Sequence, residues 1–137
     1  MSEAEQLSLS RLSSALDRLG EALAQPSSNP LYLDGTIQRF EFCFELIWKL
    51  AKAVGRLHGL DEQSPREVLK AAFQQQWIED EAAWTKMLED RNLSSHTYRE
   101  ALATELYGRI GGHYNAMKDL RDKLSHALFA LEPRKDR

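Results

Sequence analysis

The stretch from Arg91 to Tyr98 carries the side chains in this chain that are best suited to chemistry. It brings together a permanent cation, a carboxamide, an imidazole and a phenol: Arg91, Asn92, His96 and Tyr98. Histidine is the side chain that moves protons near neutral pH, and the guanidinium fork matches the oxygens of a phosphate. The stretch therefore predicts a site in which Arg91 and Asn92 bind a phosphate and His96 transfers protons.

These groups require a break in the helix to work together. On a continuous helix Arg91 and His96 would point about 140° apart, since each residue advances by about 100°. A helical pattern runs up to Leu88, two serines interrupt it, and Thr97 with Glu100 has the spacing of a capping box. We therefore expect a new helix after Thr97, with His96 at its N-terminal mouth, where backbone N–H groups favour an anion.

A second arginine and histidine have the same spacing and serve as a decoy. Arg121 and His126 lie in a pattern that predicts an unbroken helix, and neither asparagine nor tyrosine accompanies them. Together with His113, His126 is expected to be an ordinary helix residue. The histidines and the single cysteine have no metal-ligand spacing, so no metal site and no cofactor are predicted.

RNA cleavage without a metal is chemically consistent with this inventory. A base removes the proton of a ribose 2′-hydroxyl, the 2′-oxygen attacks the adjacent phosphate, an acid protonates the leaving 5′-oxygen, and a cation stabilises the phosphorane. One copy of the chain offers one suitable imidazole, that of His96. Two copies that meet at a dimer interface would supply both the acid and the base.

Length and composition predict one soluble domain, residues 1–137. The chain has 42% hydrophobic and 28% charged residues, enough for one core. Its net charge of −3 argues against a protein that coats nucleic acid in general, so any RNA contacts are expected to use a few positioned cations. Cys43, the only cysteine, lies in an apolar helical run and is expected to be a buried thiol. We see no signal peptide and no membrane span, and expect a cytoplasmic protein.

Apolar residues recur at three- and four-residue steps and predict a series of helices. The first covers Leu9 to Leu23, and the run from Pro26 to Pro30 is expected to be a loop. The second runs from near Asp34 and Gly35 to about Gly55.

Cap residues and glycines divide the second half of the chain. Ser64 starts a short third helix with Val68, Leu69, Ala72 and Phe73 on its buried face, and Asp80 caps a fourth. The last helix is long and is expected to kink, or to meet another backbone, at Gly111 and Gly112. Residues 133–137 are expected to fray.

The second helix is apolar on two sides. One stripe consists of Ile37, Phe40, Phe44, Ile47, Ala51 and Val54, and the other side carries Phe42, Leu46 and Ala53. A helix central in a bundle would explain this pattern. A homodimer seam explains it better, because one helix of so small a domain rarely buries both sides within its own chain.

The motif Arg-Asn-x-x-x-His-x-Tyr resembles that of the HEPN proteins (higher eukaryotes and prokaryotes nucleotide-binding). More narrowly, the chain resembles the HepT-like group, which is also described as nucleotidyltransferase substrate-binding proteins. The likeness extends roughly from Leu12 to Leu131. Besides the motif it includes four stretches: Ile37–Phe42, Glu45–Lys49, Ser64–Glu67 and Trp84–Asn92.

The resemblance implies an all-α, antiparallel four- to five-helix bundle of HEPN type that forms a homodimer. It implies a toxin of a toxin–antitoxin pair, a metal-independent endoribonuclease that acts on RNA with Arg91, Asn92 and His96 as catalytic residues. Its partner would be a small nucleotidyltransferase antitoxin that transfers AMP to Tyr98, in a heterotetramer or larger assembly.

Two other interpretations stay open. The chain could be a non-catalytic subunit that presents substrate to a two-component nucleotidyltransferase. It could also be a helical interaction module in which the Arg–His turn is structural.

Overall fold

The computed structural model describes residues 1–131, and these form five α-helices and one 3₁₀ turn, without a strand. The helices are α1 (Glu3–Leu23), α2 (Pro30–Leu57), α3 (Pro65–Gln74), α4 (Glu81–Leu93) and α5 (Glu100–Phe129), and the 3₁₀ turn is Ser94–His96. The all-α prediction is confirmed. The expected frayed tail, residues 133–137, lies outside the described residues.

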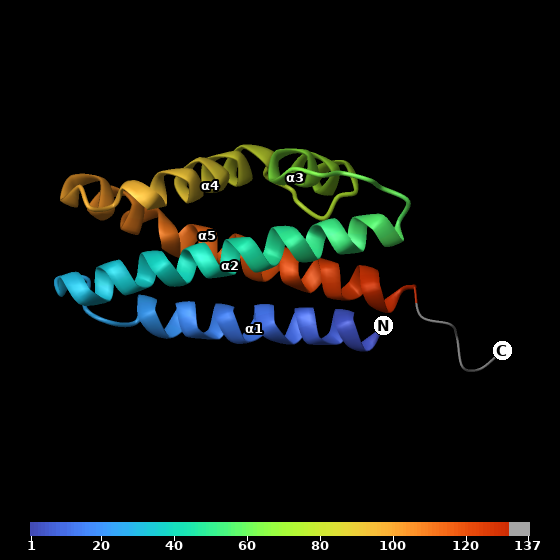
Figure 1. Cartoon of the computed structure of the whole chain (residues 1–137), viewed down its shortest axis with the longest axis horizontal. Helices are drawn as coiled ribbons and strands as arrows, with labels where there is room; N and C mark the ends of the chain where they lie inside the picture. Colours follow the sequence, from blue (N-terminus) through green and yellow to red (C-terminus); the bar gives the residue numbers. More distant parts are fainter. Residues whose placement is uncertain (132–137) are drawn as a thin grey trace.

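The helices form an elongated bundle (Figure 1). α1 runs antiparallel to α2 and packs against both α2 and α5. α3 and α4 return along the other side of the bundle, so that α2 and α5 run in the same direction. The end of α4 and the start of α5 therefore meet at one end of the molecule, where the predicted motif lies.

The core sits where α1, α2 and α5 meet. Its largest fully buried side chains include Leu12, Leu16, Leu19, Phe40, Phe44, Ile47, Leu106, Ile110 and Met117. Burying each such side chain stabilises the fold by about 1.5–3 kcal/mol relative to exposure. Cys43 belongs to this core, as predicted, and burial raises the pKa of its thiol to about 12.

The helix starts follow their cap residues. Ser64 accepts a hydrogen bond from the backbone N–H of Glu67 at 3.2 Å, and Asp80 caps α4 as expected. The predicted start of the second helix near Asp34 and Gly35 is wrong. Asn29 caps α2, and Pro30 occupies the first turn, where its missing N–H costs nothing.

Two smaller expectations are also wrong. Phe73 is 39% exposed because the buried face of α3 is completed by Ala71 and Ala72. α5 continues without interruption through Gly111 and Gly112, and a Cβ at either glycine would meet nothing within 4 Å. Each glycine lowers the stability of the helix by about 1 kcal/mol relative to alanine. The buried side chains before and after the glycines offset this cost by packing in the core.

Within residues 1–131, no helix combines the length and the apolar character that crossing a bilayer requires.

Candidate active site

The predicted break in the helix is confirmed, and hydroxyl groups shape it. α4 ends at Leu93, and Ser94 Oγ donates to the carbonyl of Arg91 at 2.6 Å. The Thr97 hydroxyl donates back to the carbonyl of Ser94 at 3.0 Å, so it does not cap α5. The expected capping box of Thr97 and Glu100 is therefore wrong. Arg99 takes the N-cap position of α5 and makes no side-chain cap bond.

Arg91 is held by α2 from across the bundle. Its Nη2 donates to Oε1 of Glu45 at 3.1 Å, and its Nε is buried without a hydrogen-bond partner. The other carboxylate oxygen of Glu45 accepts from Trp48 Nε1 at 3.4 Å and lies 3.8 Å from Lys49 Nζ. The Arg91 side chain keeps 28% exposure, so part of the guanidinium faces solvent while α2 fixes the rest.

His96 and Tyr98 lie on the outside of the turn. Asn92 and His96 are exposed, and Tyr98 is 82% exposed. The rings of His96 and Tyr98 meet edge to face, with centroids 6.2 Å apart. On a continuous helix these two side chains would point about 200° apart, but helical geometry begins only at Glu100, so the rings can meet. Both rings are within reach of a large ligand.

Tyr98 borders a groove of about 400 Å³. Residues from the α1–α2 loop and from the starts of α2 and α5 line it, among them Ser28, Leu33, Asp34 and Thr104. A groove of this size lies within the range that small-ligand sites occupy, about 300–1,000 Å³.

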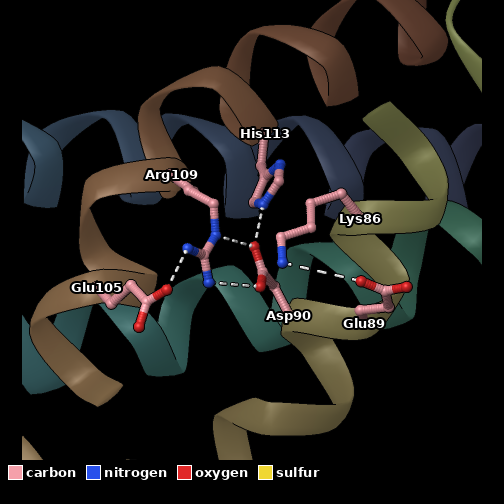
Figure 2. Close-up of polar contacts among 6 residues, drawn as sticks. All are labelled: Lys86, Glu89, Asp90, Glu105, Arg109 and His113. Carbon is pink, nitrogen blue, oxygen red and sulfur yellow. Dashed lines mark hydrogen bonds and ion pairs between the residues drawn. The ribbon is translucent and has the colours of Figure 1, made fainter. Parts of the chain in front are cut away.

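Directly before Arg91 lies a buried charge network that sequence reasoning missed (Figure 2). Asp90 has no exposed surface, and Arg109 donates to both of its oxygens at 2.8 Å through Nε and Nη2. His113 Nε2 lies 2.7 Å from Oδ2 of Asp90, and Arg109 also bonds Glu105 at 3.2 Å. Arg109 and His113 are one helical turn apart, so the sequence indicated that these two side chains share a face of α5. No local pattern connects them to Asp90.

His113 is therefore not the ordinary helix residue that was expected. It is 7% exposed, and its ring stacks on Phe40 of α2 with centroids 5.5 Å apart. Since an ionised carboxylate only accepts hydrogen bonds, the Nε2 facing Asp90 carries a proton.

The charge state of Asp90 follows from its partners. Burial raises the pKa of this carboxyl, but the hydrogen bonds from Arg109 and His113 lower it by more, and its pKa lies below the ordinary value. Asp90 in turn raises the pKa of Arg109. The Asp90 carboxylate and the Arg109 guanidinium are therefore ionised near neutral pH.

Asp90 should make the stability of the fold depend on acid pH. Because its pKa is lower in the folded protein, its contribution is complete above the ordinary carboxyl pKa of about 3.9 and is lost as the pH falls further. Asp90→Asn removes the charge that pairs with Arg109 and turns one acceptor oxygen into an amide donor that faces other donors. It is expected to lower the free energy of unfolding by about 3–5 kcal/mol at pH 7. Below about pH 4 this difference should shrink.

Urea unfolding of both proteins between pH 7 and pH 2.5 measures the effect, with the exposed Asp17→Asn on α1 as the control. A difference in unfolding free energy between Asp90→Asn and the unmodified chain that is the same at every pH would contradict this account.

Among residues 1–131, no group of three or more histidine, cysteine, aspartate or glutamate side chains is arranged to hold a metal ion.

Comparisons with known proteins place the chain. The family described as "Nucleotidyltransferase substrate binding protein like" matches residues 7–126. The "Probable ribonuclease HepT" of Haemophilus influenzae is 30% identical over 81 residues, which are 56% of each chain. The match therefore spans little more than half the length of that curated relative.

Two solved structures are similar over most of the chain. One, from Thermus thermophilus, has 32% identity and a TM-score of 0.78, and the match covers 82% of this chain and 98% of that one. The other is a Haemophilus influenzae protein reported as the fold of a substrate binding domain of a nucleotidyltransferase. It has 26% identity and a TM-score of 0.76, with 85% and 98% of the two chains covered.

Proposed function

The chain belongs to the family of nucleotidyltransferase substrate binding protein like proteins, and we propose that it is a HEPN-type, metal-independent endoribonuclease, the toxin of a toxin–antitoxin pair. The observation that carries the proposal is the exposed imidazole of His96 in a turn that starts at the anchored cation of Arg91. The similarity to a probable ribonuclease supports it. We place its action in the cytoplasm.

The proposed reaction uses the exposed groups of the turn. The imidazole of His96 in one copy takes the proton of the ribose 2′-hydroxyl, and the 2′-oxygen bonds to phosphorus. The His96 imidazole of a second copy protonates the 5′-oxygen as its bond to phosphorus breaks, leaving a 2′,3′-cyclic phosphate and a 5′-hydroxyl. Arg91 and Asn92 bind the phosphate oxygens as negative charge grows on them.

This reaction requires a homodimer, and α2 offers the surface. Phe42 is 54% and Leu57 48% exposed, and Ala53 is exposed on the same helix. Glu45, which holds Arg91, lies on α2 as well, so a second copy bound there would approach the motif turn. An exposed apolar helix face of this kind is typical of a subunit interface.

Light scattering at micromolar concentration is expected to give the mass of a dimer. Phe42→Glu should shift the protein to monomer, because the interface would have to bury an unpaired carboxylate. The matched control is Phe129→Glu at the end of α5, where an exposed phenylalanine lies on another helix. A monomeric unmodified chain, or a dimer that Phe42→Glu leaves intact, would contradict the α2 interface.

A non-catalytic substrate-binding subunit is the second candidate. It is favoured by the family description and by the Glu45–Arg91 ion pair, which already engages part of the guanidinium. Incubating the purified protein with RNA in the presence of a chelator separates the two functions. Cleavage with 2′,3′-cyclic phosphate ends supports the ribonuclease, and intact RNA supports the binding subunit.

The proposed partner is a nucleotidyltransferase antitoxin that transfers AMP to Tyr98, in a heterotetramer or larger assembly. The 82% exposure of Tyr98 makes its hydroxyl accessible to the active site of such an enzyme. The groove of about 400 Å³ beside the phenol leaves room for a nucleotide.

A further inference from the structure

The last turn of α4 is anchored by a carboxylate instead of by apolar packing. Earlier in the helix, Trp84, Met87 and Leu88 are buried in the core. From residue 89 to residue 93, the only fully buried side chain is that of Asp90, and Leu93 is only partly buried. The position of the last turn of α4 therefore depends on the side chains that bind Asp90.

Asp90 is held at one point by α5, and α2 supports one of the α5 side chains that hold it. Its oxygens receive both arms of the Arg109 fork from α5, and His113 lies 2.7 Å away on the same helix. The His113 ring also stacks on Phe40 of α2. Figure 2 shows Arg109 and His113 converging on Asp90 from α5. The next residue, Arg91, is tied to Glu45 of α2 at 3.1 Å. Two consecutive residues thus fix the start of the motif turn against α5 and α2.

A buried charge network of this kind is an inefficient way to gain stability. Apolar side chains of similar volume commonly stabilise a core as well or better, because burying charges costs desolvation energy. What the network adds is direction, since the planar guanidinium fork donates two parallel hydrogen bonds to the carboxylate in a defined geometry. A network with a fixed geometry that lies directly before Arg91 can therefore fix the position of the candidate site.

We propose that Asp90 is a positioning residue for the active site: through Arg109 and His113 it sets the last turn of α4 on α5, and with it the places of Arg91 and His96. The proposal rests on the ribonuclease function proposed above. An error of about 1 Å in such groups can lower a rate by about 10²-fold. Asp90 itself has no exposed surface through which a substrate could touch it.

Two variants separate positioning from stability. Asp90→Asn, assayed at a temperature where it is fully folded, should lower kcat for RNA cleavage by about 10²-fold with KM little changed. Asp90→Leu/Arg109→Met/His113→Phe replaces the whole network by apolar side chains and should keep a melting temperature close to that of the unmodified chain while losing cleavage to a similar degree. The control is Leu124→Ala, a destabilised core variant on α5 far along the chain from the turn, which should keep kcat when folded.

Amide hydrogen exchange provides a readout that does not depend on RNA cleavage. The quantity to compare is the amide exchange rate of residues 91–97 divided by that of residues 84–88. This ratio should be at least about tenfold higher in Asp90→Asn than in the unmodified chain, and it should not change in Leu124→Ala. Unchanged exchange in the turn, or an apolar variant with full kcat, would overturn the positioning role. If the unmodified chain cleaves no RNA, the ribonuclease proposal fails, and the exchange ratio still decides whether Asp90 fixes the turn.

Discussion

Replacing Arg91 or His96 with alanine is expected to lower RNA cleavage by at least about 10²-fold. Removing a proton-transfer group typically costs about 10²–10⁴-fold, and removing a preorganised charge donor about 10²–10³-fold. In cells, expression of the chain without its partner should slow growth, and either variant should relieve this effect. Growth curves and a cleavage assay with purified protein measure both outcomes.

Two controls make this result specific. His126→Ala removes the histidine of the decoy pair and should leave growth arrest and cleavage intact. Arg91→Lys keeps the charge but loses the fork, and it should remain impaired because lysine cannot bind two phosphate oxygens in the same geometry. If both motif variants arrest growth as strongly as the unmodified chain, the substrate-binding subunit becomes the better account.

Local patterns were enough to predict the helices, and they failed where two local signals competed. Three- and four-residue spacing located α1, α2 and α5 because each has a broad buried face. The start of α2 was misplaced because Asn29 and Pro30 are typical both of a loop and of a helix N-terminus. The Asn29 side chain decides between them, because it accepts a hydrogen bond from the backbone N–H of Leu31 at 2.9 Å and so caps the helix.

The motif turn was predictable because its determinants are local, whereas its supports are not. The two serines that break the helix lie within five residues of Arg91. Glu45 lies 46 residues before Arg91, and His113 lies 23 residues after Asp90, so their contacts depend on how three helices pack. Sequence reasoning could therefore propose the chemistry of the turn but not the side chains that hold it. Two of the missed residues, Asp90 and His113, are buried polar groups, and Asp90 has no exposed surface.

Adding AMP to Tyr98 is expected to switch off cleavage when the partner nucleotidyltransferase and ATP are present. The phosphodiester carries one negative charge and is attached to a ring whose centroid lies 6.2 Å from that of His96. At about this distance, repulsion of an RNA phosphate costs about 1–3 kcal/mol for dielectric values between those of water and of a protein surface. That cost alone corresponds to a roughly 5- to 150-fold loss, and the bulk of the adenosine adds to it.

Intact-mass measurement should show one or more AMP units on the chain, and peptide mapping should place them on Tyr98. Tyr98→Phe lacks the acceptor oxygen and should remain toxic with the partner present. Tyr107→Phe on α5 serves as the matched control and should stay under control of the partner, because Tyr107 is partly buried while Tyr98 is 82% exposed. An unmodified mass with partner and ATP would reject the switch while leaving the ribonuclease assignment to stand on Arg91 and His96. An adduct that leaves cleavage at full rate would instead show that the phenol lies outside the path of the RNA.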